Sequence, residues 1–196
     1  LLCAYNEKLR RSIKYNFEVQ NRDREERSRR SCNPLLSCFV RDCLSRGVDI
    51  ERGGATYNWI MPSFVGVPNL VDSLYVIKTL IFERKELTFA KLKQIIDRNF
   101  EGCEDVRQRI LNLPKYGNDI DEVDSLFTLI TDHIVAECRK HQPILPDAKL
   151  IPSLFCWIMH EHFGSGTGAT PDGRKAGFPL GDGAGPVQGR EQRGPT

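Results

Sequence analysis

Long apolar runs are missing from this sequence, and so is an excess of charge of either sign. No run is long enough to span a bilayer as a helix, and the first residues do not predict a leader of the secretory type. The 28 Lys and Arg residues nearly balance the 26 Asp and Glu residues, for a net charge of +2. This balance favours neither a nucleic-acid nor a membrane partner. With 40% hydrophobic and 28% charged residues, the composition is typical of a soluble globular protein.

Cysteine pairs and the common nucleotide or hydrolase motifs are also missing. The seven cysteines are odd in number and form no Cys-x-x-Cys pair, so a cytoplasmic, reducing compartment fits better than a disulfide framework. There is no P-loop, no dinucleotide GxGxxG after a strand, and no nucleophile elbow. His160 and His162 would share one face of a strand, but a third metal ligand at useful spacing is not evident, so we predict no metal site.

Apolar residues recur with a helical period along most of the chain. A helix is expected over 1–19, and the charged stretch 21–30 is either its solvated end or a linker. Further helices are expected where apolar faces continue, with Pro34, Thr88, Gly47 and Gly102 as start and stop signals. These predicted helices span 34–46, 69–81, 88–101, 104–113 and 121–140.

Strands are few and short. Residues 55–61 are rich in aromatic and β-branched side chains between Gly and Pro residues, which predicts a buried strand. The apolar run 150–159 is ambiguous, and we favour a strand. Strands separated by helices indicate an α/β architecture with a covered sheet. Too few strands are present to close a sheet or barrel, so we expect the sequence to be a fragment.

Residues 164–196 hold 10 of the 16 glycines and no periodic pattern, which predicts a long loop. Pro171-Asp172-Gly173 is a tight-turn sequence, and Arg174 after it either clamps a carboxylate or buttresses the loop. On the residues alone, a surface turn is favoured. Earlier in the chain, the acids at 119–124 lie near a helix N-terminus, where the helix dipole favours negative charge.

Several stretches, in order and at matching spacing over roughly residues 33–196, resemble one family. Together they resemble the glycyl radical enzymes of the pyruvate formate-lyase and glycerol/diol dehydratase superfamily. The Asp-Ser-Leu helix and the Gly-Pro-Thr ending are more similar to the dehydratase, decarboxylase and C–N lyase branch. The stretches are Arg46–Asn58, Asn69–Lys78, Asn99–Gly102, Pro114–Asp124, Thr167–Gly183 and Gly194–Thr196.

The resemblance implies an α/β fold, a helix-rich part of a ten-stranded α/β barrel. Residues 1–32 would be a helical lead-in with a charged linker, 33–163 part of the barrel, and 164–196 the loop leading towards a glycyl radical domain. The catalytic Cys and the radical Gly would both lie outside this chain. No cofactor would be bound by the chain itself.

The resemblance also implies partners and site residues. A radical S-adenosylmethionine enzyme with an iron–sulfur cluster would install the glycyl radical, and the intact enzyme would be a homodimer acting on a small molecule. The loop would be structured by Thr170, Asp172, Gly173 and Arg174, without substrate contact. The wall of the substrate pocket would include Trp59, Met61, Ser63, Phe64 and Val65.

The wall residues leave alternatives open. Each of them is equally well explained as a core residue. Ser63 stands where the dehydratase branch often has a polar amide, which leaves the substrate open. We therefore predict a radical lyase or dehydratase that cleaves a C–O, C–N or C–C bond of a small polar substrate. The alternatives are pyruvate formate-lyase (formate C-acetyltransferase) and a non-catalytic barrel remnant.

Overall fold

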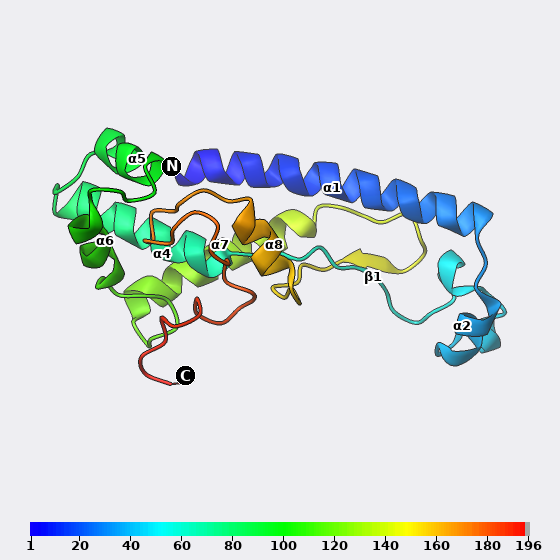
Figure 1. The fold of residues 1–196 in the computed structure, drawn as a ribbon. Coiled ribbons are helices and arrows are strands. Elements are labelled where there is room, and N and C mark those ends of the chain that lie inside the picture. The colour runs from blue at the N-terminus through cyan, green and yellow to red at the C-terminus, as the bar shows by residue number, and fades with distance from the viewer. Residues whose placement is uncertain (195–196) are drawn as a thin grey trace. The chain divides into compact units, whose positions relative to one another are not determined.

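The computed structural model describes residues 1–194, which divide into two compact units. The first unit comprises Leu1–Pro62 and Asp132–Ser153, and the second comprises Ser63–Thr131 and Leu154–Thr196. Figure 1 shows the course of the chain. The helices are α1 (Leu2–Arg30), α2 (Pro34–Phe39), α3 (Cys43–Arg46), α4 (Val67–Ile77), α5 (Phe89–Asp97), α6 (Glu104–Leu111), α7 (Asp121–Cys138) and α8 (Met159–Ser165), with a 3-10 turn η1 (Ile50–Arg52) and a π-helical segment η2 (Lys78–Glu83). The strands are β1 (Asn58–Ile60) and β2 (Ala148–Leu150).

Helix α1 of the first unit is longer than its apolar pattern predicts. The charged stretch 21–30 is its C-terminal part and not a linker. Oppositely charged side chains one turn apart, such as Glu25 and Arg29, favour the helix there. Arg24 anchors this part by donating to the backbone oxygen of Trp59 at 2.8 Å.

The helix expected over 34–46 is broken into two short ones. Asp42 adopts a left-handed conformation with φ 73°, a conformation that Asp tolerates better than most residues. Because the break reorients the segment, the predicted buried face does not form in the described residues. Leu35, Phe39 and Leu44 are instead strongly exposed.

The sheet of the first unit is a parallel pair, β1 and β2, in which Asn58 lies opposite Ala148 and Ile60 opposite Leu150. The strand predicted over 55–61 shrinks to three residues. The preceding bend is held by the Asn58 side-chain amide, which donates to the backbone oxygens of Gly53 and Ala55 at 3.1 and 2.9 Å. Asn58 and Ile60 are therefore buried, whereas Trp59 between them is 42% exposed.

The strand favoured over 150–159 is wrong for most of that run. β2 ends at Leu150, Pro152 cannot donate to a ladder, and only Phe155 forms an isolated bridge, to Gly183. The run then enters α8, so His160 and His162 lie on a helix and not at a strand end. Residues two apart on a helix do not face each other, which removes the geometric basis of a shared metal site.

The second unit is built around α4. Of the apolar face predicted for 69–81, only Leu74 and Leu80 are fully buried. The helix is instead buried on nearly every side, and its buried residues include Asn69, Asp72 and Ser73. Polar groups in such an interior need partners, so the chain around α4 must supply them. The α5 start is as predicted: Thr88 Oγ1 accepts from the Lys91 N–H at 3.2 Å.

Candidate functional site

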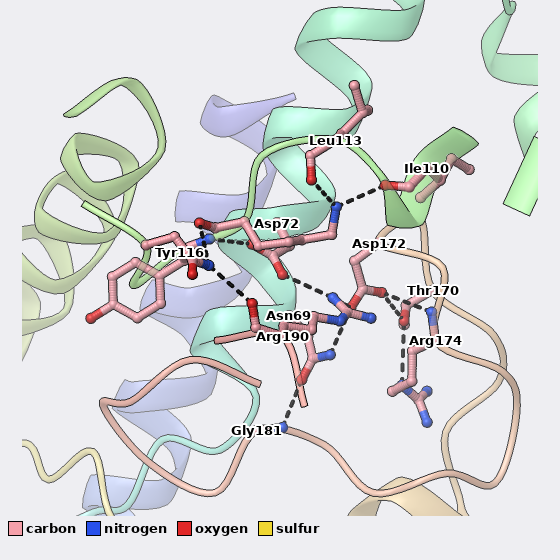
Figure 2. A network of polar contacts seen from close by, with 12 residues as sticks. Asn69, Asp72, Ile110, Leu113, Tyr116, Thr170, Asp172, Arg174, Gly181 and Arg190 are labelled. Carbon is pink, nitrogen blue, oxygen red and sulfur yellow. Dashed lines mark hydrogen bonds and ion pairs between the residues drawn. The ribbon is translucent and has the colours of Figure 1, made fainter. Parts of the chain in front are cut away.

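The described residues gather their most buried charges in the second unit, where Arg190 lies between Asp72 and Asp172 (Figure 2). Arg190 Nη1 is 2.8 Å from Asp72 Oδ2 and 2.7 Å from Asp172 Oδ2. Both carboxylates are essentially inaccessible, at 1% and 0% exposure. Buried carboxylates of this kind require a cation and further hydrogen bonds. One guanidinium thus joins α4 to two distant parts of the Gly/Pro-rich loop.

Asn69, one turn before Asp72, extends this ion network towards the loop. Its Nδ2 donates to Asp172 Oδ2 at 2.7 Å, and its Oδ1 accepts from the Gly181 N–H at 2.7 Å (Figure 2). A side-chain amide supplies both a donor and an acceptor. Asn69 therefore pairs a buried carboxylate and a loop N–H at the same time.

The turn between α6 and α7 provides further hydrogen bonds to Asp72 and to the end of the loop. The Tyr116 N–H donates to Asp72 Oδ1 at 2.9 Å (Figure 2). Lys115 Nζ donates to the backbone oxygens of Ile110 and Leu113 at 2.7 and 2.6 Å. Asn118 then ties the turn to the end of the loop. Its Oδ1 accepts from the Gln192 N–H at 2.7 Å.

Of the acidic residues expected near the N-terminus of α7, Asp124 contacts the same turn. Asp124 accepts from the N–H groups of Gly117 and Ile120 at 2.9 and 3.0 Å. Its carboxylate therefore orders the backbone just before the helix, where the helix dipole favours negative charge. Tyr116 stacks on Phe127, with ring centroids 4.2 Å apart.

The Thr170–Arg174 turn is ordered mainly through its own side chains. Thr170 Oγ1 donates to Asp172 Oδ1, and the Arg174 guanidinium donates to the backbone oxygens of Thr167, Gly168 and Phe178. Arg174 was expected either to clamp a carboxylate or to support the loop. Its contacts with backbone oxygens favour the second role. Gly173 has φ +90°, the left-handed region that favours glycine.

Burial governs the electrostatics of this ion network. It lowers the pKa of Lys115 to about 8, against the opposing attraction of Asp72. Burial also acts to lower the pKa of Arg190, but the carboxylates of Asp172 and Asp72 outweigh it and the pKa is raised. The cluster is thus a charge-paired support that carries no exposed nucleophile. Within residues 1–194, no group of three His, Cys, Asp or Glu side chains is arranged to hold a metal ion.

The predicted pocket-wall residues fall in both units. In the first unit, Trp59 and Met61 are 42% and 53% exposed, and Trp59 lines a cavity of about 260 Å³ with Arg24 and Tyr57. In the second unit, Ser63 is exposed, and Phe64 and Val65 are half-buried. Their role as a substrate wall stays a prediction.

Sequence reasoning missed the residues that bind the loop to α4. In the sequence these residues lie in separate stretches, and no local pattern connects them. The available signal was the presence of charged and amide side chains inside otherwise apolar stretches, since such groups need buried partners. The missed residues are Asn69, Asp72, Lys115, Asn118 and Arg190.

Comparison with known proteins places this geometry in a family. Residues 1–164 match the family model described as pyruvate formate lyase-like. The chain is 37% identical over 170 residues to the probable dehydratase YbiW of Escherichia coli, covering 83% of this chain and 21% of that protein. It superposes on hydroxyproline dehydratase of Clostridioides difficile with a TM-score of 0.92 and 30% identity, covering 98% and 24% of the two chains. A glycyl radical enzyme of Archaeoglobus fulgidus gives a TM-score of 0.84 at 30% identity, over 95% and 24%.

The chain belongs to the pyruvate formate lyase-like family, and its homologues are glycyl radical enzymes of the dehydratase and lyase type. The predicted family is thereby confirmed. The family match begins at residue 1, so the lead-in helix is part of the resemblance that the motifs placed only from about residue 33. The chain spans about a fifth to a quarter of the length of these relatives.

Proposed function

We propose that the gene product carrying this chain is a glycyl radical lyase or dehydratase that cleaves a C–O, C–N or C–C bond of a small polar organic substrate. The proposal rests mainly on the superposition on hydroxyproline dehydratase over 98% of this chain. Similar proteins named as a trans-4-hydroxy-L-proline dehydratase and an isethionate sulfite-lyase favour this branch over formate C-acetyltransferase.

In this proposal the chain is a support and part of a wall. The fold would be part of a ten-stranded barrel, to which β1 and β2 contribute strands. The catalytic Cys and the radical Gly would lie outside residues 1–196, and a radical S-adenosylmethionine enzyme would install the radical. When present, the radical supplies the hydrogen abstraction that starts such cleavages, and the surrounding protein excludes water. The intact protein would be a cytoplasmic homodimer.

Within this wall, the exposed face of β1 is proposed to meet the substrate. Trp59 in β1 and Met61 directly after the strand alternate with the buried Asn58 and Ile60, as side chains on opposite faces of an extended segment do. Ser63 would add one hydroxyl to a mostly apolar wall. Thr170, Asp172, Gly173 and Arg174 would order the loop without touching substrate.

Among residues 1–194, no helix combines the length and apolar character needed to cross a membrane.

The test begins with the full gene product, incubated without oxygen with a radical S-adenosylmethionine activating enzyme. An organic-radical signal in electron paramagnetic resonance is expected, followed by substrate cleavage. Trp59→Ala should raise KM without changing the radical yield, whereas Tyr15→Ala on the exposed face of α1 should leave both unchanged. A gene product that acquires no radical would support the non-catalytic remnant instead. An unchanged KM for Trp59→Ala would contradict only the role of the wall.

A further inference from the structure

A cavity of about 510 Å³ lies beside the ion network in the second unit. Its size is within the range of small-molecule sites. Four cationic side chains line it, together with one acid, Glu161. The cationic residues are Arg107, Arg174, Lys175 and Arg190.

Arg190, one of the lining residues, keeps hydrogen-bonding capacity beyond its two ion pairs. Both of its described ion pairs use Nη1, which contacts Asp72 and Asp172. Its Nε and Nη2 have no acceptor among residues 1–194. Because a guanidinium presents its donors in a fork that matches an oxyanion, the free edge of Arg190 suits a carboxylate or phosphate oxygen.

Arg107 and Lys175 add two further cations, each only partly neutralised. Arg107 donates through Nε to the Gly173 oxygen at 2.9 Å and through Nη1 to Glu104 at 2.7 Å, which leaves Nη2 without a described acceptor. Lys175 Nζ is 3.4 Å from the other oxygen of Glu104. One carboxylate thus serves two cations, so the lining keeps donors for an anion.

The remaining lining is backbone and apolar surface. The N–H groups of Gln188 and Gly189 donate to no described acceptor, and Phe178, Pro179 and Val187 supply carbon surface. An occupant that matches this lining has an oxyanion at one end and a small apolar body. A bare cation is excluded by the four positive side chains.

We propose that this cavity binds a small organic oxyanion, a carboxylate or a phosphate ester, between Arg190, Arg107 and Lys175. The inference goes beyond the proposed function, because it requires neither the radical nor the substrate wall. It also predicts opposite effects for two substitutions. Lys175→Gln removes a cation from the rim and should weaken binding, whereas Glu161→Gln removes the acid from the lining and should strengthen it.

The experiment titrates the non-activated full gene product with benzoate and, separately, with phenyl phosphate at constant ionic strength. Saturation-transfer difference and ³¹P line-broadening spectra follow the two probes. Saturable binding is expected for at least one probe, weaker by roughly three- to tenfold in Lys175→Gln and tighter by a smaller factor in Glu161→Gln. Lys93→Gln is the matched control. It removes a lysine paired to Asp97 on α5 and should leave binding unchanged.

Two outcomes overturn the proposal. Absence of saturable binding for both probes means that, in the intact protein, the cavity is occupied by other residues or has no measurable affinity for an organic anion. Saturable binding that responds equally to Lys175→Gln and Lys93→Gln means that the anion responds to overall charge and not to this cavity. Because the protein is not activated, neither outcome depends on the proposed radical chemistry.

Discussion

The interior around α4 in the second unit and the β1–β2 sheet in the first unit differ in which side chains they bury. Around α4, buried charges such as Asp72 and Asp172 find partners within the described chain. At the sheet, the apolar side chains of Trp59 in β1 and of Met61 directly after it remain exposed, and a two-stranded sheet alone is marginal in water. The carboxylates buried around α4 are therefore ion-paired within the second unit, whereas the apolar side chains at and just after β1 are left exposed.

The largest effect should come from removing the central cation of the ion network. Arg190→Met leaves two buried carboxylates without their shared partner, which costs about 3–5 kcal/mol for a broken buried pair. Hydrogen exchange of the full gene product should show this loss as faster exchange at the amides of Gly181 and Gln192, which the network holds.

Arg22→Met, on the exposed surface of α1, is the control for that substitution. It removes the same charge without breaking a buried pair, and exchange in the loop should not change. Equal protection of the loop in both variants would mean that Arg190 does not hold it, and the contrast between the two regions would fail.

A glycine substitution tests whether the first unit is also tightly built near its sheet. A Cβ at Gly54 would lie 1.9 Å from the Val48 backbone oxygen, and no side-chain rotation can relieve that clash. Gly54→Ala should cost about 3 kcal/mol, at the upper end for overpacking, and lower the thermal midpoint. Gly185→Ala, with nothing within 4 Å of its Cβ, should have little effect, and a similar loss in both would contradict this packing.

Alkaline pH should strengthen the second unit through Lys115. Its pKa is lowered by burial from 10.5 to about 8, so the folded state releases the proton before the unfolded state does. Below about pH 8 the buried charge on Lys115 lowers the free energy of unfolding. This free energy rises by at most roughly 3 kcal/mol as the pH increases from about 8 towards 10.5. Exchange at Gly181 should therefore slow, relative to the intrinsic rate, as the pH rises from about 8 towards 10.5.

Lys115→Met removes this titration and should flatten the profile. The first-unit amide of Ile151, which donates to Ile60, serves as the internal reference, since no buried lysine lies in that sheet. A pH response of equal size at Ile151 would assign the effect to the whole protein and not to Lys115.

The smallest expected effect concerns the start of α5. Thr88→Ala removes the acceptor of the Lys91 N–H and should cost about 1 kcal/mol, typical of an N-cap. Thr128→Ala, at an exposed position within α7, is the matched control and should be neutral or slightly stabilising. Circular dichroism during thermal unfolding would measure the midpoints of both variants. Equal midpoints would mean that the Thr88 cap does not stabilise α5.

The helices were largely predictable because their signals are local. Thr88 and Pro34 mark helix starts in the sequence and in the structure, and α7 follows its apolar repeat. The break at Asp42 was not predictable, since it depends on one left-handed residue inside an otherwise helical pattern. β2 was misplaced because its pairing with β1 joins residues 90 positions apart, and no local pattern carries that information.

The ion network was present in the sequence only as separate pieces. Asp72 interrupts an apolar helix, and Asp172 and Arg190 lie in a loop without periodicity. Each motif by itself is explained by a turn or a solvated charge. Two of their contacts join residues more than 100 positions apart, Arg190 with Asp72 and Asn69 with Asp172, so only the three-dimensional structure unites them.

The separation of Asp72 and Arg190 in the sequence also determines how long the ribosome takes to make Arg190 after Asp72. Arg190 follows Asp72 by 118 residues, which a ribosome adds in roughly 6 to 24 s at 5–20 residues per second. During this interval α4 carries a carboxylate whose cation has not yet been made. Burying α4 before Arg190 is made would leave the Asp72 carboxylate without this cation, which is costly. We therefore expect α4 to remain in contact with water until the loop has been synthesised. The interior around α4 is thus expected to form late on the nascent chain, after Arg190 has been added.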